Sequence, residues 1–407
     1  MDHQIHRLTR SIREARGGEP WTFLVSDHGE ALGGHGEASH GVLAYYETMH
    51  GLLAVTPPEG TPRDAFPPGP LPDLARFTDV LPTVLDALEL DPPQGIDGRS
   101  LLRPTGAELG AYGESYYSAI NFGWSAVLSW RDDRWTYIEA PAPELYDRRT
   151  DPEESVDVSS QHPDVVERLS RKIAELTTLP DEPSGPALDP DTEAQLLALG
   201  YVTGGSSGGA LQIDTSKSPR KLIRAVNHMF RGIALMSQGK VAEALPSLQA
   251  AYRGDPNNST VLFHLADCLY NLGDLPTSLA YYRRCVELDP TMGQAWGHLA
   301  SMEFDRGNRD EAMRLLEQGL SASPTAFPLL MTAGDLHRSL GETKEAEGFY
   351  TVASEQYGNR AEPWVRLAEL EEARGNVGEA DRYWDRALEA NPNHPFVPDR
   401  IRARLGK

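Results

Sequence analysis

The stretch NLGDLPTSLAYYRRCVELDP (residues 271–290) holds a glycine, a small residue, a large aromatic residue and a proline at spacings that recur through the second half of the chain. A glycine returns every 34 residues, at Gly239, Gly273, Gly307, Gly341 and Gly375. Five positions after each glycine stands a small residue: Ala244, Ser278, Ala312, Ala346 and Ala380. The proline recurs at Pro256, Pro290, Pro324 and Pro392, with Gly358 in the remaining place. This register predicts a repeat architecture.

We expect each copy to be a pair of antiparallel helices. The small residue lets the two helices approach closely, a large residue such as Tyr282, Tyr350 or Trp384 fills the gap beside it, and the proline ends the second helix. The first copy carries Arg231 where later copies carry leucine, as suits an end repeat. The final segment DRIRARLGK (399–407) is expected to form a capping helix. The five predicted copies cover residues 225–258, 259–292, 293–326, 327–360 and 361–394.

This register resembles that of the tetratricopeptide repeat family. The resemblance implies an all-α solenoid over residues 221–407, with a concave groove that binds a protein or peptide partner. Two other uses stay open from the residues alone, since the solenoid can also serve as a structural spacer or as a dimerisation arm.

Composition and charge narrow the possible partners. The chain has 407 residues, 40% of them apolar, and a formal net charge of -22, so its surface repels nucleic acid and anionic membranes. No apolar run approaches transmembrane length, and the polar N-terminus lacks the apolar core of a signal peptide, so no compartment is predicted. Cys268 and Cys285 are too few for a disulfide framework, and we expect both to be packing residues.

The N-terminal half mixes helical and strand patterns. Ile5, Leu8 and Ile12 recur at helical spacing, and the apolar runs near residues 21–26 and 50–55 predict short strands. Residues 77–90 predict a helix with Thr78 as its N-cap and a buried apolar face formed by Val80, Leu81, Val84, Leu85 and Leu88. Further patterns predict strands across 111–138, a hairpin turn at 131–134, a helix at 165–176, and a Gly/Ser-rich linker at 203–220.

A second stretch, SDHGEALGGHGEASHG (residues 26–41), follows the first predicted strand. Asp27 and His28 come directly after the strand, where a carboxylate and an imidazole can both reach one divalent cation. Gly29 allows the sharp turn, and His35 and His40 can return to the same locus, where they contact the cation or an anionic ester group. The residues alone therefore indicate a metal or anion site.

This stretch resembles the second metal motif of the sulfatase family, within the alkaline-phosphatase-like superfamily. Four further segments of this sequence resemble family segments in the same order. They are FTDVLPTVLDALEL (77–90), GIDGRSLL (95–102), ELYDRRTDPEESVDVSSQHPDVVERL (144–169) and LLALGYV (196–202). The resemblance implies that residues 1–202 are the C-terminal portion of a sulfatase-like α/β domain, followed by the solenoid.

The resemblance also implies roles for individual residues. Asp27 and His28 match the family's second pair of metal ligands. The expected metal is Ca²⁺, with Mn²⁺ or Zn²⁺ as alternatives. His40 is the main candidate to contact the anionic group of a sulfate or phosphate ester, and His35 is the second candidate. No catalytic residue is assigned, because the family's C-x-P-S-R or S-x-P-S-R nucleophile motif does not occur in this sequence. We therefore expect a truncated ester hydrolase with little or no turnover, or alternatively a non-catalytic binding scaffold with a vestigial sulfatase half. Relatives of this kind are often exported.

Overall fold

The computed structural model describes residues 2–61, 69, 74–102, 110–177, 214–391, 397 and 401. The chain divides into two compact units. The first, here called the N-terminal unit, includes Met1–Ala119, Trp124–Glu182 and Ile213–Ile223; the second includes Ile120–Gly123 and Arg224–Lys407 and contains the repeats. The LLALGYV segment and most of the predicted linker lie outside the described residues, as does the predicted capping helix apart from Ile401.

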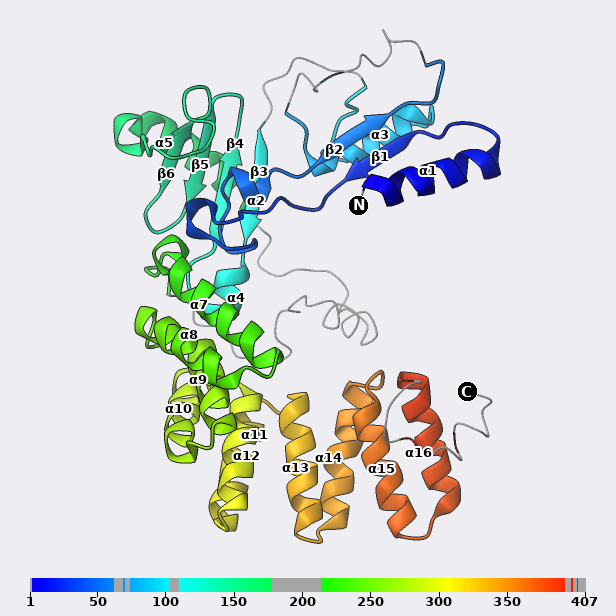
Figure 1. Cartoon of the computed structure of the whole chain (residues 1–407), viewed down its shortest axis with the longest axis vertical. Helices are drawn as coiled ribbons and strands as arrows, with labels where there is room; N and C mark the ends of the chain where they lie inside the picture. The colour runs from blue at the N-terminus through cyan, green and yellow to red at the C-terminus, as the bar shows by residue number, and fades with distance from the viewer. Residues whose placement is uncertain are drawn as a thin grey trace. The chain divides into compact units, whose positions relative to one another are not determined.

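The N-terminal unit combines short helices with small sheets (Figure 1). Its helices and helical turns are α1 (Asp2–Arg16), η1 (Gly34–Gly36), α2 (Tyr46–Met49), η2 (Phe77–Asp79), α3 (Val80–Ala87), η3 (Ser159–Gln161), α5 (Pro163–Thr177) and the first residues of α4 (Tyr117–Phe122) and α7 (Pro219–Ser237). Its strands are β1 (Thr22–Val25), β2 (Leu53–Thr56), β3 (Ala111–Ser115), β4 (Val127–Arg131), β5 (Trp135–Glu139) and β6 (Glu144–Asp147).

Every strand pair in the described part of the unit is antiparallel. Strands β1 and β2 form a two-stranded sheet in which Val25 pairs with Leu53. The second sheet has the order β3-β4-β5-β6, and the hairpin predicted at 131–134 joins β4 to β5. Asp132 stabilises this turn because its Oδ1 accepts hydrogen bonds from the backbone N–H groups of Arg134, at 3.0 Å, and Trp135, at 2.7 Å.

Helix α5 covers the second sheet (Figure 1). Leu169 and Ile173 lie four residues apart, on the same helix face, and both are completely buried. They pack against Trp135, Tyr137 and Leu145 of β5 and β6. The helix predicted at 165–176 is present, and its buried face is the one that packs on this sheet.

The helix predicted over residues 77–90 begins as η2 and continues as α3. The predicted cap, Thr78, is wrong, because the buried carboxylate of Asp79 organises this end instead. Its oxygens accept hydrogen bonds from the backbone N–H of Arg76, at 2.9 Å, and of Arg99, at 3.0 Å. A buried carboxylate needs such donors, and Arg76 also forms an ion pair with it at 2.8 Å.

The predicted buried face of α3 is also partly wrong. Leu81 and Leu88 are 53% and 57% exposed, whereas Pro82 and Thr83 are buried. The buried side of the helix faces the GIDGRSLL segment, since the hydroxyl of Thr83 accepts a hydrogen bond from the backbone N–H of Leu101 at 3.0 Å. A polar docking partner therefore decides which face is covered, and the apolar pattern does not show it.

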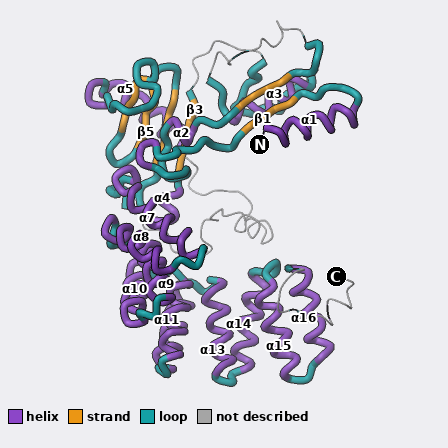
Figure 2. The backbone as a smooth tube through the Cα atoms, viewed as in Figure 1, coloured by secondary structure: helices purple, strands orange, loops and turns teal. Residues whose placement is uncertain are grey.

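The solenoid consists, over its described residues, of consecutive antiparallel helix pairs (Figure 2). The first helices of the second to fifth repeats begin at Ser259, Gly293, Phe327 and Ala361, at the predicted 34-residue interval. After α7 the helices are α8 (Val241–Gly254), α9 (Ser259–Asn271), α10 (Leu275–Leu288), α11 (Gly293–Asp305), α12 (Arg309–Ala322), α13 (Phe327–Ser339), α14 (Thr343–Gln356), α15 (Ala361–Ala373) and α16 (Val377–Ala390).

The repeated residues take the roles that the register predicts. The glycines that end the first helix of each pair have positive φ, as Gly273 does at 84°, in a region that side chains with a Cβ rarely adopt. The small residues five positions later, among them Ala312 and Ala346, are completely buried between helices. Within the described residues, no helix is both long and apolar enough to cross a membrane.

Candidate functional site

Hydrogen bonds from both of its ends fix the loop that carries Asp27 and His28. Ser26 follows β1, and its hydroxyl accepts the backbone N–H of Leu52 at 2.7 Å. Gly29 donates its backbone N–H to the carbonyl of Thr48 at 2.9 Å. A Cβ at Gly29 would lie 2.1 Å from the carbonyl oxygen of Glu47, so only glycine allows this close approach.

Asp27 and His28 lie side by side and face solvent. The Asp27 carboxylate Oδ1 is 3.6 Å from His28 Nε2, and the two side chains are 83% and 43% exposed. His28 Nδ1 lies 2.7 Å from the carbonyl oxygen of Gly29 and donates to it when that nitrogen carries the proton. In that tautomer Nε2, the ring nitrogen nearer to Asp27, carries the lone pair that can ligate a metal.

His40 returns to the same place, as the sequence suggests. Its ring centroid lies 3.9 Å from that of His28, and its Nδ1 is 2.9 Å from a carboxylate oxygen of Glu30. The loop that carries His40 is closed by the buried carboxylate of Glu37, which accepts the backbone N–H groups of Val42, at 2.8 Å, and Leu43, at 3.1 Å. Burial raises the pKa of Glu37 despite these two hydrogen bonds.

Asp27, His28 and His40 line one cleft of about 350 Å³. Another part of the wall is formed by Glu114, near the end of β3, and by Tyr116 and Tyr117 just beyond it. Burial raises the pKa of both tyrosines, so their hydroxyls stay protonated and can donate hydrogen bonds to a bound anion. The sequence analysis missed this wall, because no motif marks these residues.

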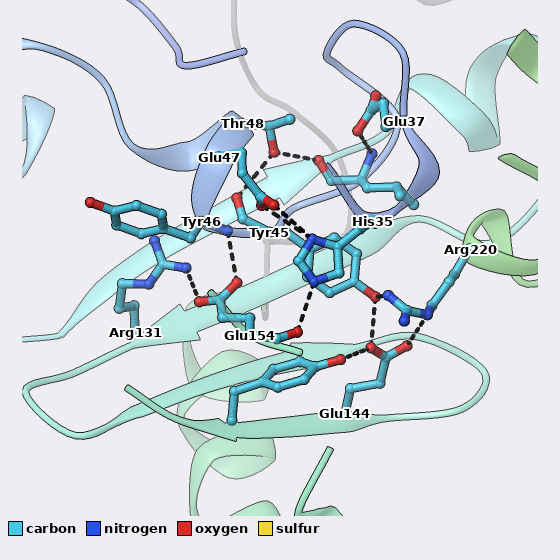
Figure 3. A network of polar contacts seen from close by, with 12 residues as sticks. His35, Glu37, Tyr45, Tyr46, Glu47, Thr48, Arg131, Glu144, Glu154 and Arg220 are labelled. Carbon is cyan, nitrogen blue, oxygen red and sulfur yellow. Dashed lines mark hydrogen bonds and ion pairs between the residues drawn. The ribbon is translucent and has the colours of Figure 1, made fainter. Parts of the chain in front are cut away.

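His35 lies apart from the cleft, in a buried polar network (Figure 3). Its ring stacks on Tyr45 with a centroid distance of 3.7 Å. Nδ1 lies 3.0 Å from the Glu47 carboxylate, and Nε2 lies 2.7 Å from the backbone carbonyl oxygen of Glu154. Both ring nitrogens therefore already face acceptors, and His35 holds loops together rather than facing a substrate.

The network continues through charged groups from distant parts of the sequence (Figure 3). Glu154 is buried, forms an ion pair with Arg131, and accepts the backbone N–H of Tyr46 at 2.7 Å. Tyr45 donates its hydroxyl to Glu144 at 2.6 Å, and Arg220 approaches the same carboxylate at 3.4 Å. These contacts position the loop between β1 and α2, which includes His40.

The cleft fits a metal ion only in part. Asp27 and His28 supply two donors at a spacing that one cation can bridge, but structural and catalytic divalent sites usually need four or more. Across the described residues, no group of three or more His, Cys, Asp or Glu side chains is arranged to hold a metal ion. The residues described therefore offer part of a coordination shell.

A second cavity, of about 480 Å³, opens on the solenoid between the first helices of three consecutive repeats, α9, α11 and α13. Burial lowers the pKa of His264 in its wall, although the nearby Asp267 raises it. His298 Nε2 lies 3.7 Å from Asp267 Oδ1. The lining residues are Phe263, His264, Asp267, Gln294, Gly297, His298, Ser301, Pro328 and Thr332.

Both cysteines are buried in the solenoid, in agreement with the packing role predicted for them. Burial raises the pKa of Cys285 to about 12 and also raises that of Cys268. A thiol with a raised pKa is a poor nucleophile, so neither residue adds a reactive group to the cavity.

Comparison with known proteins supports both resemblances at different strengths. Family models described as tetratricopeptide repeat match residues 231–293 and 297–323. The chain is 29% identical over 100 residues to the Hsp70-Hsp90 organizing protein of Triticum aestivum. This alignment covers 25% of this chain and 17% of that protein. A solved structure of a thermophilic TPR protein from Thermus thermophilus covers 45% of this chain and all of its own, at 23% identity and a TM-score of 0.38. The C-terminal half consists of tetratricopeptide repeats.

Two further relatives are sulfatases. The chain is 28% identical over 161 residues to the uncharacterized sulfatase YidJ of Escherichia coli (strain K12), and 24% identical over 179 residues to arylsulfatase K of Xenopus laevis. These alignments cover 38% and 40% of this chain. The chain spans 31% and 32% of the lengths of these two relatives.

Proposed function

We propose that the protein is a binding scaffold whose solenoid groove holds a segment of a partner protein. The observation that carries the proposal is the cavity between α9, α11 and α13, because it lies on the first helices of successive repeats. Stacked repeats of this kind present such helices as an extended binding surface. The cavity offers an amide, hydroxyls, imidazoles and a carboxylate, which are groups that bind peptide backbone and polar side chains.

A matched pair of substitutions tests this proposal in the full chain. Gln294 is exposed and lines the cavity, whereas Gln318 is exposed on α12, a second helix of the pair. We expect Gln294→Arg to weaken capture of a partner at least tenfold, because it places a long charged side chain in the groove. Gln318→Arg introduces the same charge elsewhere and should leave capture unchanged. Equal loss in both variants would argue against the groove as the binding surface.

We further propose that the N-terminal unit is a sulfatase-like portion that binds, but does not efficiently hydrolyse, a sulfate or phosphate ester. Three predicted residues, Asp27, His28 and His40, line one cleft, and this convergence favours the proposal. Asp27 and His28 would hold the divalent cation, which would polarise the ester when bound. A protonated His40 would contact the ester's anionic group, and Tyr116 and Tyr117 would donate hydrogen bonds to it.

Cation binding and turnover test this second proposal separately. Titration calorimetry with Ca²⁺, Mn²⁺ and Zn²⁺ should show weak binding that Asp27→Asn reduces at least tenfold. Asp133→Asn, at an exposed hairpin position of the same unit, is the matched control. Model aryl sulfates and phosphodiesters should show no metal-dependent turnover above background. Rapid turnover would contradict the proposal, and binding unaffected by Asp27→Asn would remove the proposed site.

A further inference from the structure

Two acidic residues occupy the same repeat position on the solenoid. Asp267 lies on α9 and Asp335 lies on α13, two repeats later. In both repeats a buried tyrosine of the second helix donates its hydroxyl to Oδ1 of the acid: Tyr282 to Asp267, and Tyr350 to Asp335, the latter at 2.6 Å. The structure therefore contains the same carboxylate–tyrosine pair twice.

The two pairs differ in the cations that face them, and at Asp335 these are two arginines, of which Arg338 on the same helix lies 3.6 Å from Oδ1. Arg366, on the following repeat, places its Nε 3.1 Å from Asp335 Oδ1. The matching position on the other pair is His298, whose Nε2 stays 3.7 Å from Asp267 Oδ1. An imidazole is shorter than an arginine side chain and lacks its fork of donors. Asp335 thus has a guanidinium from the chain itself, and Asp267 does not.

The space in front of Asp267 is the 480 Å³ cavity. Gly297 helps to create it, because the equivalent positions of the neighbouring repeats carry the larger Phe263 and Met331. Tyr282 and His298 both meet Oδ1 of Asp267, and among the residues that the structure describes its Oδ2 has no hydrogen-bond or ion-pair partner. The carboxylate therefore has an oxygen available toward the cavity.

We propose that Asp267 receives the guanidinium of an arginine side chain on the partner segment, in the place that Arg366 takes at Asp335. The inference rests on the proposed scaffold function and names the chemistry of its ligand. A carboxylate and a guanidinium form short, charge-assisted hydrogen bonds. The aromatic side chains of Phe263 and His298 also line the cavity. The formal net charge of -22 attracts basic segments to the protein.

Among the described residues, the titratable groups around the cavity include one carboxylate and no lysine or arginine. Besides Asp267, they are His264 on α9, Tyr282 on α10 and His298 on α11, whereas α13 contributes the uncharged Pro328 and Thr332. Burial lowers the pKa of His264, so its imidazole adds little positive charge beside a guanidinium near neutral pH.

Titration of the isotope-labelled full chain with small probes, followed by NMR, tests the inference. N-acetyl-arginine methylamide should shift the amide signals of Ser301 and Thr332. N-acetyl-glutamate methylamide should cause no such shifts. Binding of the glutamate probe, or of neither probe, would overturn the inference.

Three variants separate this contact from general disruption of the solenoid. Asp267→Asn should lower the affinity of the chain for the arginine probe at least tenfold. His298→Arg should abolish its binding, because it supplies an internal guanidinium as Arg366 does in the other pair, while the amide spectrum stays that of a folded chain. Asp335→Asn is the matched control and should keep probe binding. If partner capture depends on Gln294 but not on Asp267, the scaffold function stands and the arginine inference fails.

Discussion

The two units of this molecule are stabilised by contacts of different range along the sequence. In the solenoid, side-chain hydrogen bonds repeat at fixed intervals, as between Tyr350 and Asp335, 15 residues apart. In the N-terminal unit, His35 binds the backbone of Glu154, 119 residues away, and Arg220 binds Tyr45, 175 residues away. A periodic sequence therefore specifies its contacts locally, whereas the N-terminal unit depends on a few buried polar groups brought together from distant segments.

The largest expected effect comes from breaking that buried network. Arg131 and Glu154 are 11% and 0% exposed, so Glu154→Ala leaves a buried guanidinium without its partner. Removal of one member of a buried ion pair typically destabilises a protein by about 3–5 kcal/mol. We expect hydrogen exchange of the Tyr46 amide and of strands β4 and β5 to accelerate at least a hundredfold in the full chain, with no change in the solenoid helices.

The surface pair of Glu167 and Arg171 on α5 provides the control. Their side chains are 74% and 64% exposed, and exposed pairs contribute little to stability. Glu167→Ala should therefore change the hydrogen-exchange rates of the same amides by no more than about twofold relative to the natural chain. A similarly small effect of Glu154→Ala would contradict the view that the network stabilises this unit.

Two glycines in the solenoid test how closely its helices pack. A Cβ at Gly319 would lie 2.7 Å from the Cβ of Trp296, while a Cβ at Gly348 on α14 would meet no atom within 4 Å. Gly319→Ala should destabilise the solenoid by about 1–3 kcal/mol through overpacking. Gly348→Ala should stabilise it by about 0.5–1 kcal/mol, because alanine favours a helix interior. The urea midpoint of the helical circular dichroism signal should move in opposite directions, and movement in one direction would refute this packing.

Periodicity predicted the solenoid down to the first residue of individual helices. The starts at Ser259, Gly293 and Phe327 coincide with the predicted copies, because each repeat contacts its neighbours in the same way. The neighbourhood of Asp27, His28 and His40 was also predictable, since a glycine-rich loop after a strand can bring such residues together.

The remainder of the cleft was not predictable in this way. Glu114 and Tyr116 reach it from a strand far along the chain, and nothing in their local sequence distinguishes them from packing residues. His35 has the same glycine-rich surroundings as His40 but lies in the buried network. Which histidine faces the cleft depends on Glu47 and Glu154, and local spacing does not reveal those partners.

The smallest expected effect is a pH dependence of the loop that carries His40. Burial raises the pKa of Glu37 above its ordinary value of 4.5, so the folded loop binds the proton more tightly than the unfolded chain does. The stability from this proton is complete below pH 4.5 and is lost as the pH rises through the folded pKa. The amide signals of Val42 and Leu43, which donate to this carboxylate, should titrate by NMR with a midpoint above 4.5. Glu37→Gln should abolish that titration. As the pH rises, the variant should become more stable relative to the natural chain, by about 1 kcal/mol for each pH unit by which the midpoint lies above 4.5. A midpoint at or below 4.5 would show that the two backbone hydrogen bonds outweigh burial and that this loop needs a charged Glu37.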